Sequence, residues 1–250
     1  MVIAWFIAPA AARLQILSLS PKHALRASAM IKRAPTDQTF VVLLGGALAV
    51  TPRLRADVAG ARVVAADGGM RHAAALGLTP EIWVGDFDST PPELLAAWSG
   101  IERQPWPAAK NETDGALAVS VAAERGAKNI VLAGALGGER SDHALMHLIH
   151  AVSLEEEGFS IKLTSGEEEA WPLLPGSREI DLPQGSLFSV LGLSPLAGLS
   201  LGNVRYPLSD FTLPFGASRT ISNVAEGPIR LSLASGRAIL IARPYDLSGA

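Results

Sequence analysis

Short apolar runs alternate with amphipathic stretches from residue 40 to about residue 166. The apolar runs are typical of buried strands and predict strands at residues 40–44, 62–66, 81–84, 129–132 and 160–164. The intervening stretches predict helices at residues 70–76, 91–98, 114–125 and 141–157. Strands that alternate with helices favour a mostly parallel sheet covered by helices on both faces.

The pattern changes after the acidic triplet at residues 167–169, which we expect to be a solvated connector. Short strand-like runs separated by Gly, Pro, Asn and Asp follow, without any long helical period. The clearest of these runs are at residues 187–191, 199–204, 230–233 and 238–241. The predicted fold class is therefore α/β, with an N-terminal mostly parallel sheet and flanking helices, followed by a C-terminal antiparallel β-sandwich.

We expect three segments: an extension at residues 1–36, an α/β domain at 37–166 and a β-sandwich domain at 167–250. Residues 2–12 are apolar but too few to span a bilayer, and no Lys or Arg precedes them. We interpret the extension as dispensable or as a misplaced start. An export or membrane-associating segment is the alternative, because Ala27-Ser28-Ala29 resembles a cleavage site.

Composition narrows the function. The chain is 48% hydrophobic and 18% charged, so it can bury a large core, and its net charge of -3 argues against broad nucleic-acid binding. The absence of cysteine excludes disulfides, zinc–thiolate sites and thiol nucleophiles, and a cytoplasmic location without a membrane partner is expected. The Walker-type loop and the dinucleotide-binding Gly-x-Gly-x-x-Gly motif are also missing.

Polar, glycine-containing motifs follow four of the predicted strands. Ligands bind at the carboxyl ends of parallel strands, and glycine allows the backbone to approach phosphates closely. The motifs therefore predict a phosphate-ligand site, although any single one could be only a turn. They are Gly45-Gly46, Asp67-Gly68-Gly69, the run Gly85-Asp86-Phe87-Asp88-Ser89, and residues 134–143.

Among these residues, Asp86 and Asp88 indicate a particular chemistry most clearly. Carboxylates this close in sequence repel each other unless a cation or a proton offsets the charge. Magnesium prefers a few carboxylates together with water and substrate phosphate oxygens, so the pair predicts a metal and phosphate centre. The alternative is an Asx-type turn in which the side chains cap backbone amides.

Two predicted helix starts add candidates. Thr113 and Asp114 suit a helix start that Thr113 caps and at which Asp114 favours the positive helix end. The same geometry would also place Asp114 at the strand ends as a third carboxylate, and both interpretations stay open. Arg140 is placed to neutralise charge on a transferring phosphoryl group. We interpret His143 as a residue that holds the helix start rather than as a base.

Taken in order, these motifs resemble the thiamine pyrophosphokinase family. They span about residues 41 to 243 and are short individually, but as an ordered series they are specific. The matching segments are LLGG (43–46), AADGG (65–69), VGDFDS (84–89), KNETD (110–114), GALGGERSDH (134–143), VRYPL (204–208) and ISN (221–223).

The resemblance implies the transfer of a pyrophosphoryl group from ATP, the co-substrate, to the thiamine hydroxyl, with Mg²⁺ as cofactor and release of AMP. It also implies a homodimer with thiamine bound between the β-domain of one subunit and the α/β domain of the other. The implied catalytic residues are Asp86, Asp88, Asp114 and Arg140, and the three aspartates are the implied metal ligands. The implied ATP-binding residues are Gly45, Gly46, Asp67, Gly68, Gly69, Ser89, Thr113, Arg140 and Asp142. Tyr206 would stack on thiamine, and Ser222 and Asn223 would hydrogen-bond to it.

Two positions depart from the family pattern. Asn111 stands where the family often has an acidic residue, and Glu139 is an extra residue before Arg140, so this loop must bulge. The sequence leaves open which carboxylate acts as the base. The alternative functions are a pyrophosphokinase for another hydroxymethyl acceptor such as a pterin, a metal-dependent glycosyltransferase, and a non-catalytic thiamine- or nucleotide-binding protein.

Overall fold

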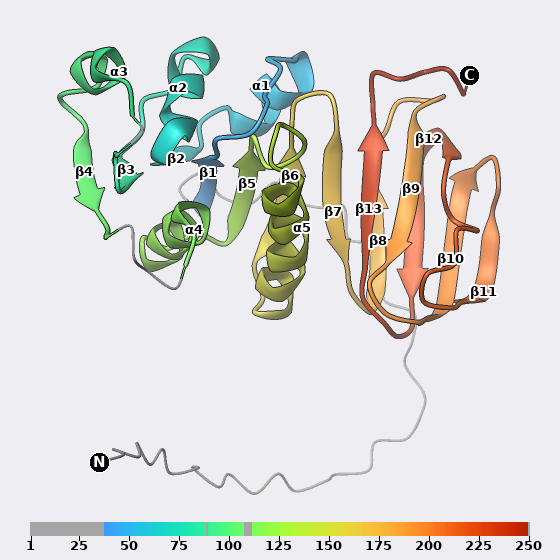
Figure 1. Cartoon of the computed structure of the whole chain (residues 1–250). Coiled ribbons are helices and arrows are strands. Elements are labelled where there is room, and N and C mark those ends of the chain that lie inside the picture. The colour runs from blue at the N-terminus through green and yellow to red at the C-terminus, as the bar shows by residue number, and fades with distance from the viewer. Residues whose placement is uncertain (1–37, 89, 108–111, 250) are drawn as a thin grey trace, which may run out of the picture. The chain divides into compact units, whose positions relative to one another are not determined.

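The computed structural model describes residues 38–88, 90–107 and 112–249 (Figure 1). These described residues form one compact unit. The predicted extension at residues 1–36, Ser89 and Asn111 lie outside the described residues. Within the described ranges, no helix is both long and apolar enough to cross a bilayer.

A parallel sheet forms the first part of this unit. Strand β1 (Thr39–Leu43) lies between β2 (Arg62–Ala66) and β5 (Asn129–Ala133) and is parallel to both. Strands β3 (Ile82–Gly85) and β4 (Glu102–Pro105) extend the sheet beyond β2, again in parallel. The predicted parallel arrangement is therefore confirmed.

Strand β4 and helix α1 (Pro52–Val58) are absent from the sequence-based prediction. Strand β4 lies at the edge of the sheet and three of its four residues are exposed, so it lacks the apolar run by which the other strands were identified. Helix α1 is short, and it begins with the Thr51 side chain accepting a hydrogen bond from the Leu54 amide, followed by proline at the first helical position. Hydrophobic periodicity therefore reveals neither element: the start of α1 is marked by its capping residues, and β4 is an exposed edge strand.

Helices cover both faces of the parallel sheet, as predicted. On one face, α4 (Asp114–Glu124) and α5 (Ser141–Glu156) pack against alternate residues of β1, β2, β3 and β5. On the other face, α1 and α2 (Arg71–Leu76) pack against the remaining strand residues, with side chains of α3 (Pro92–Ala97) at the margin. The predicted helix at residues 70–76 begins at Arg71, because a 3-10 turn occupies Asp67–Met70.

The antiparallel part continues the same sheet. Strand β6 (Ser160–Thr164) is parallel to β5 on one side and antiparallel to β7 (Glu169–Leu173) on the other. Pairing then proceeds through the remaining strands in the order β13, β9, β12, β10 and β11, with β8 paired to β12. These strands are β13 (Ala238–Arg243), β9 (Leu187–Gly192), β12 (Asn223–Leu233), β10 (Leu196–Val204), β11 (Leu208–Leu213) and β8 (Gly176–Ile180).

The prediction of antiparallel strands is confirmed, but that of a separate sandwich needs correction. The thirteen strands of the described residues are connected in one mixed sheet, because β7 pairs directly with β6 and the long strand β12 pairs with β9 at its start and with β10 and β8 further along. A second hydrophobic core joins apolar residues of β7, β9 and β13 to those of β8, β10 and β12. A hydrophobic pattern reports which residues are buried but not which strand edges pair.

Glu169 corrects the expectation that the acidic triplet is a solvated connector. Its side chain is only 1% exposed. Arg53 donates from Nε and Nη2 to its two carboxylate oxygens at 2.9 Å each, and Lys162 Nζ lies 3.2 Å from the same carboxylate. Lys162 also contacts Asp57 at 2.5 Å, so the network ties α1 to β6 and β7. Glu169 is buried because two cations neutralise its charge.

We predict that Glu169→Gln lowers the free energy of unfolding by about 3–5 kcal/mol, because it leaves two partly buried cations with too little compensating charge. Urea denaturation measures the loss. The matched control is Glu156→Gln, which breaks the exposed 2.5 Å pair with Arg237 and should cost at most about 1 kcal/mol. Equal losses in the two variants would contradict the role given to Glu169.

Candidate functional site

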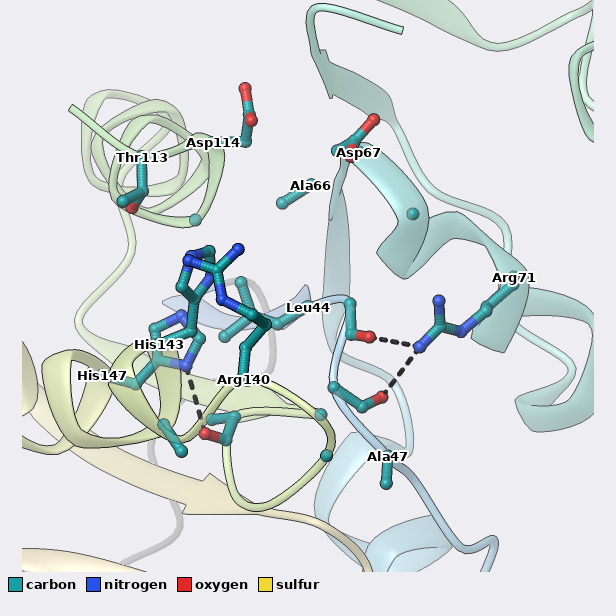
Figure 2. Close-up of a pocket in the computed structure, with 18 of the residues that line it drawn as sticks. Leu44, Ala47, Ala66, Asp67, Arg71, Thr113, Asp114, Arg140, His143 and His147 are labelled. Carbon is teal, nitrogen blue, oxygen red and sulfur yellow. Dashed lines mark hydrogen bonds between the residues drawn. The ribbon is translucent and has the colours of Figure 1, made fainter. Parts of the chain in front are cut away.

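A cavity of about 870 Å³ lies where several parallel strands end (Figure 2). The loop after β1, the turn after β2 and the loop after β5 contribute to its wall, together with the starts of α4 and α5. The structure thus brings together most of the residues predicted from the glycine-containing motifs. The predicted residues that line the cavity are Gly45, Gly46, Asp67, Gly68, Thr113, Asp114 and Arg140.

The backbones of three loops meet without space for side chains. A Cβ atom on Gly46 would lie less than 3.0 Å from the carbonyl oxygen of Gly134, and one on Gly69 would lie equally close to that of Leu43. The Gly46 amide donates to this same Gly134 carbonyl at 3.1 Å. Gly46 and Gly69 are therefore required by packing between loops, in addition to any approach to phosphate.

Asp67 follows β2 in a left-handed backbone conformation, with φ of 39°. The Thr90 hydroxyl donates to its carboxylate at 3.3 Å, and the Trp83 indole donates to its carbonyl at 2.8 Å. Burial raises the pKa of Asp67, and the carboxylates of Asp114 and Asp86 raise it further, while the Gly68 amide opposes the shift. The three aspartates therefore influence one another electrostatically.

Asp86 and Asp88 lie beside this cavity rather than on its wall. The Asp86 carboxylate accepts a hydrogen bond from the Asp88 amide at 3.2 Å, so the Asx-type turn considered for this pair is present. Phe87 between them has φ of 62°, and its ring packs edge-on against Trp83 with centroids 5.1 Å apart. Over the described ranges, no three His, Asp or Glu side chains are grouped closely enough to hold a metal ion.

The start of α4 serves as a cap and as cavity wall. The Thr113 hydroxyl accepts from the Ala116 amide at 3.2 Å, which is the cap considered from the sequence. Thr113 and Asp114 nevertheless both line the cavity. The cap thus holds Asp114 at the strand ends, and the two interpretations describe the same arrangement.

The start of α5 brings Arg140 to the cavity. Arg140 donates from Nε and Nη2 to the two Asp142 oxygens at 2.9 and 2.7 Å, and this pair is exposed. The Arg140 guanidinium holds the pKa of Asp142 well below its usual range. Gly137 and Gly138 both have positive φ, which accommodates the bulge expected from the extra Glu139. Asp142 therefore orients Arg140 and does not itself line the cavity.

Arg71 is a cavity residue that the sequence-based prediction missed. Its guanidinium donates to the carbonyls of Gly45 and Gly46 (Figure 2). His72 Nε2 lies 3.0 Å from the Gly46 carbonyl. Burial lowers the pKa of His72. Across the part of the chain that the structure describes, Arg71 forms no ion pair with a carboxylate. Its position two residues after Gly69 of the Asp67-Gly68-Gly69 motif was the available signal.

His143 and His147 line the same cavity from α5. His147 Nδ1 lies 3.1 Å from the Ala135 carbonyl, and burial lowers the pKa of His147. The two rings meet edge-on with centroids 6.3 Å apart. His147 therefore connects α5 to the loop after β5.

The residues expected to bind thiamine lie in the antiparallel part, and none lines the cavity. The Tyr206 side chain is 56% exposed. Ser222 has φ of 59°, and its amide donates to the Ser189 hydroxyl at 3.0 Å. The Asn223 side chain is buried and bonded to the backbone of Tyr206. The described residues of one chain therefore do not bring these positions into the cavity.

Parallel strands that end at a glycine-lined cavity with carboxylates and guanidinium groups place this cavity where α/β proteins commonly bind their ligands. Residues 59–163 match the family model described as the catalytic domain of thiamin pyrophosphokinase. The resemblance to the thiamin pyrophosphokinase family is therefore confirmed over these residues.

Solved structures support the fold of the whole unit. Thiamine pyrophosphokinase from Bacillus subtilis has a TM-score of 0.73 and 23% identity, over 82% of this chain and 98% of that chain. The enzyme from Geobacillus thermodenitrificans has a TM-score of 0.67 and 26% identity, over 82% and 96%. The Candida albicans enzyme has a TM-score of 0.71 and 13% identity, over 83% and 89%. No curated protein sequence matches the chain significantly.

We predict that Gly46→Ala lowers the free energy of unfolding by about 1–3 kcal/mol, because its Cβ would displace the backbone of Gly134. Gly45→Ala is the matched control, since the nearest neighbour of its Cβ would be the Gly69 nitrogen at 4.0 Å. The control should change the stability by less than about 0.5 kcal/mol. Thermal or urea denaturation compares the two, and a Gly46→Ala protein as stable as the control would refute the packing argument.

Proposed function

We propose that this protein is a thiamine pyrophosphokinase, which transfers a pyrophosphoryl group from ATP to the hydroxyl of thiamine and releases AMP. The match of residues 59–163 to the catalytic domain of that family carries the proposal. The likeness of the whole described unit to solved thiamine pyrophosphokinases supports it. A cytoplasmic location suits this chemistry and the cysteine-free sequence.

The cavity is the proposed ATP site. Its volume of about 870 Å³ is within the range of small-molecule pockets, and the start of the 11-residue helix α4 lies at the cavity wall. Arg71 and Arg140 supply guanidinium groups that suit a polyphosphate. ATP binding would involve Gly45, Gly46, Asp67, Gly68, Gly69, Thr113, Arg140 and Asp142, with Ser89 as an expectation that lies outside the described residues.

Asp86, Asp88 and Asp114 are the proposed ligands of Mg²⁺. The described residues hold no preassembled group of three metal ligands, but magnesium needs only one or two carboxylates when waters and substrate phosphates complete its shell. Burial raises the pKa of Asp67, and the carboxylates of Asp114 and Asp86 raise it further, a repulsion that a cation would relieve. When bound, the ion would offset charge on the phosphates.

In the proposed reaction the thiamine hydroxyl oxygen forms a bond to the β-phosphorus of ATP, and the bond from that phosphorus to the bridging oxygen of AMP breaks. The hydroxyl proton passes to a carboxylate of the site. Arg140, fixed by Asp142, offsets charge on the transferring group, and the glycine loops position the phosphates. Catalysis of this kind depends on positioning and electrostatics rather than on a covalent intermediate.

Thiamine would bind through Tyr206 by stacking and through the segment that contains Ser222 and Asn223. These three positions lie within residues 167–250, the proposed acceptor-binding domain. The ATP cavity is formed by residues of the segment 37–166. Since none of the three lines the cavity of its own chain, the acceptor residues of one subunit would complete the site of another in a homodimer. Size-exclusion chromatography with light scattering tests the dimer.

Purified protein incubated with ATP, Mg²⁺ and thiamine should produce thiamine diphosphate and AMP in equal amounts, separated by liquid chromatography. Asp86→Asn and Asp114→Asn should each lower kcat by about 10²-fold or more, because each removes a proposed ligand of the metal ion that would offset charge on the phosphates. Asp210→Asn, at an exposed position of β11, is the matched control and should retain activity. Thiamine monophosphate with ADP would refute pyrophosphoryl transfer, and a pterin diphosphate formed in preference would change the acceptor.

A further inference from the structure

The side chain of Asn223 is occupied by the protein's own backbone. It is 4% exposed. Its Oδ1 accepts from the Tyr206 amide at 3.1 Å and from the Val224 amide at 2.8 Å, while its Nδ2 donates to the Tyr206 carbonyl at 2.9 Å. An asparagine oxygen has two acceptor positions, and both are used here. Asn223 therefore has no free oxygen with which to receive a hydrogen bond from a ligand.

These bonds continue the pairing of β10 with β12 beyond the point where the strands separate. Val204 is paired with Ala225, and the Arg205 amide donates to the Val224 carbonyl at 2.9 Å. At the next residue the backbone groups of Tyr206 bond to the Asn223 side chain instead of to a strand. The side chain acts as a substitute for a backbone partner and satisfies both polar groups of Tyr206.

The segment before Asn223 is itself fixed to β9. The Thr220 hydroxyl donates to the Val190 carbonyl at 2.6 Å, and the Ser222 amide donates to the Ser189 hydroxyl at 3.0 Å. Asn223 is paired with Phe188 of the same strand. Asn223 thus connects a rigid strand to the backbone of Tyr206, while the Tyr206 ring stays 56% exposed.

We propose that Asn223 is a positioning residue, which fixes the backbone of Tyr206 and through it the direction of the exposed ring that receives the acceptor. The inference rests on the proposed function, in which Tyr206 stacks on thiamine, and it replaces the expectation that Asn223 hydrogen-bonds to thiamine. A stacking contact depends on the offset and angle of the two rings, so loss of the backbone clamp weakens it.

A double-mutant cycle in the transfer reaction separates positioning from direct contact. Asn223→Ala and Tyr206→Ala should each raise the KM for thiamine about tenfold, with the KM for ATP and kcat changed less than about twofold. If Asn223 acts through Tyr206, Asn223→Ala adds less than about twofold in the Tyr206→Ala protein. Effects that multiply in the double variant would overturn the proposal.

If Asn223→Ala does not fold, a conservative variant and a matched control still test the proposal. Asn223→Asp keeps the acceptor oxygens but replaces the donor to the Tyr206 carbonyl by a charge, and it should raise the KM for thiamine. Asn203→Asp removes the same kind of bond on β10, since Asn203 Nδ2 donates to the Pro228 carbonyl at 2.8 Å. The Asn203 control should leave the KM for thiamine within about twofold, and an equal rise in both variants would overturn the proposal.

A spectroscopic measurement tests the positioning without turnover. The chain has only two tyrosines, Tyr206 and Tyr245, so fluorotyrosine labelling gives two ¹⁹F resonances, and Tyr245 serves as the internal reference. Asn223→Asp should shift or broaden the Tyr206 resonance and leave the other unchanged. An unaffected Tyr206 resonance would overturn the positioning role. If Asn223→Asp shifts the Tyr206 resonance but the unaltered protein forms no thiamine diphosphate, the positioning role is supported and only the proposed function is refuted.

Discussion

Direct packing of backbone on backbone at the carboxyl ends of β1, β2 and β5 is the constraint on which the cavity depends. The Leu44 amide donates to the Ala133 carbonyl at 2.7 Å, and the Gly46 amide donates to the Gly134 carbonyl at 3.1 Å. No Cβ fits at Gly46, Gly69 or Gly134. These contacts hold the loops together, so the polar residues that follow the loops line the same cavity. Loops held in this way lose little conformational entropy when a ligand binds.

The loop after β1 is also hydrogen-bonded to the β6–β7 junction, where the sheet changes from parallel to antiparallel pairing. The Ala49 amide donates to the Ser165 carbonyl at 2.8 Å, and the Thr51 hydroxyl donates to the Gly166 carbonyl at 3.1 Å. The carboxylate of Glu169 then holds α1 through Arg53. The cavity loop, α1 and the β6–β7 junction are therefore held together at the point where the antiparallel strands continue the sheet.

Hydrophobic periodicity was sufficient to predict the buried strands and the mostly parallel sheet, because these elements are selected by burial. It missed β4, whose residues are exposed at an edge, and the direct pairing of β7 with β6, which depends on strand edges. Motifs at strand ends located the cavity, but the contribution of Arg71 depends on a side-chain direction that spacing does not encode. Asn223 was identified as important, yet a sequence does not distinguish an amide bonded to a ligand from one bonded to a neighbouring backbone.

The charges in the cavity restrict what can occupy it. Asp67, Asp114 and Glu139 line it together with Arg71 and Arg140, and the raised pKa of Asp67 reflects burial and the field of nearby carboxylates. A polyphosphate alone would meet carboxylates that repel it. A divalent cation alone would find no group of three acidic or imidazole ligands among the described residues. A polyphosphate that brings a cation would satisfy both sets of charges at once, because its oxygens would supply metal ligands while the guanidinium groups would offset the remaining negative charge.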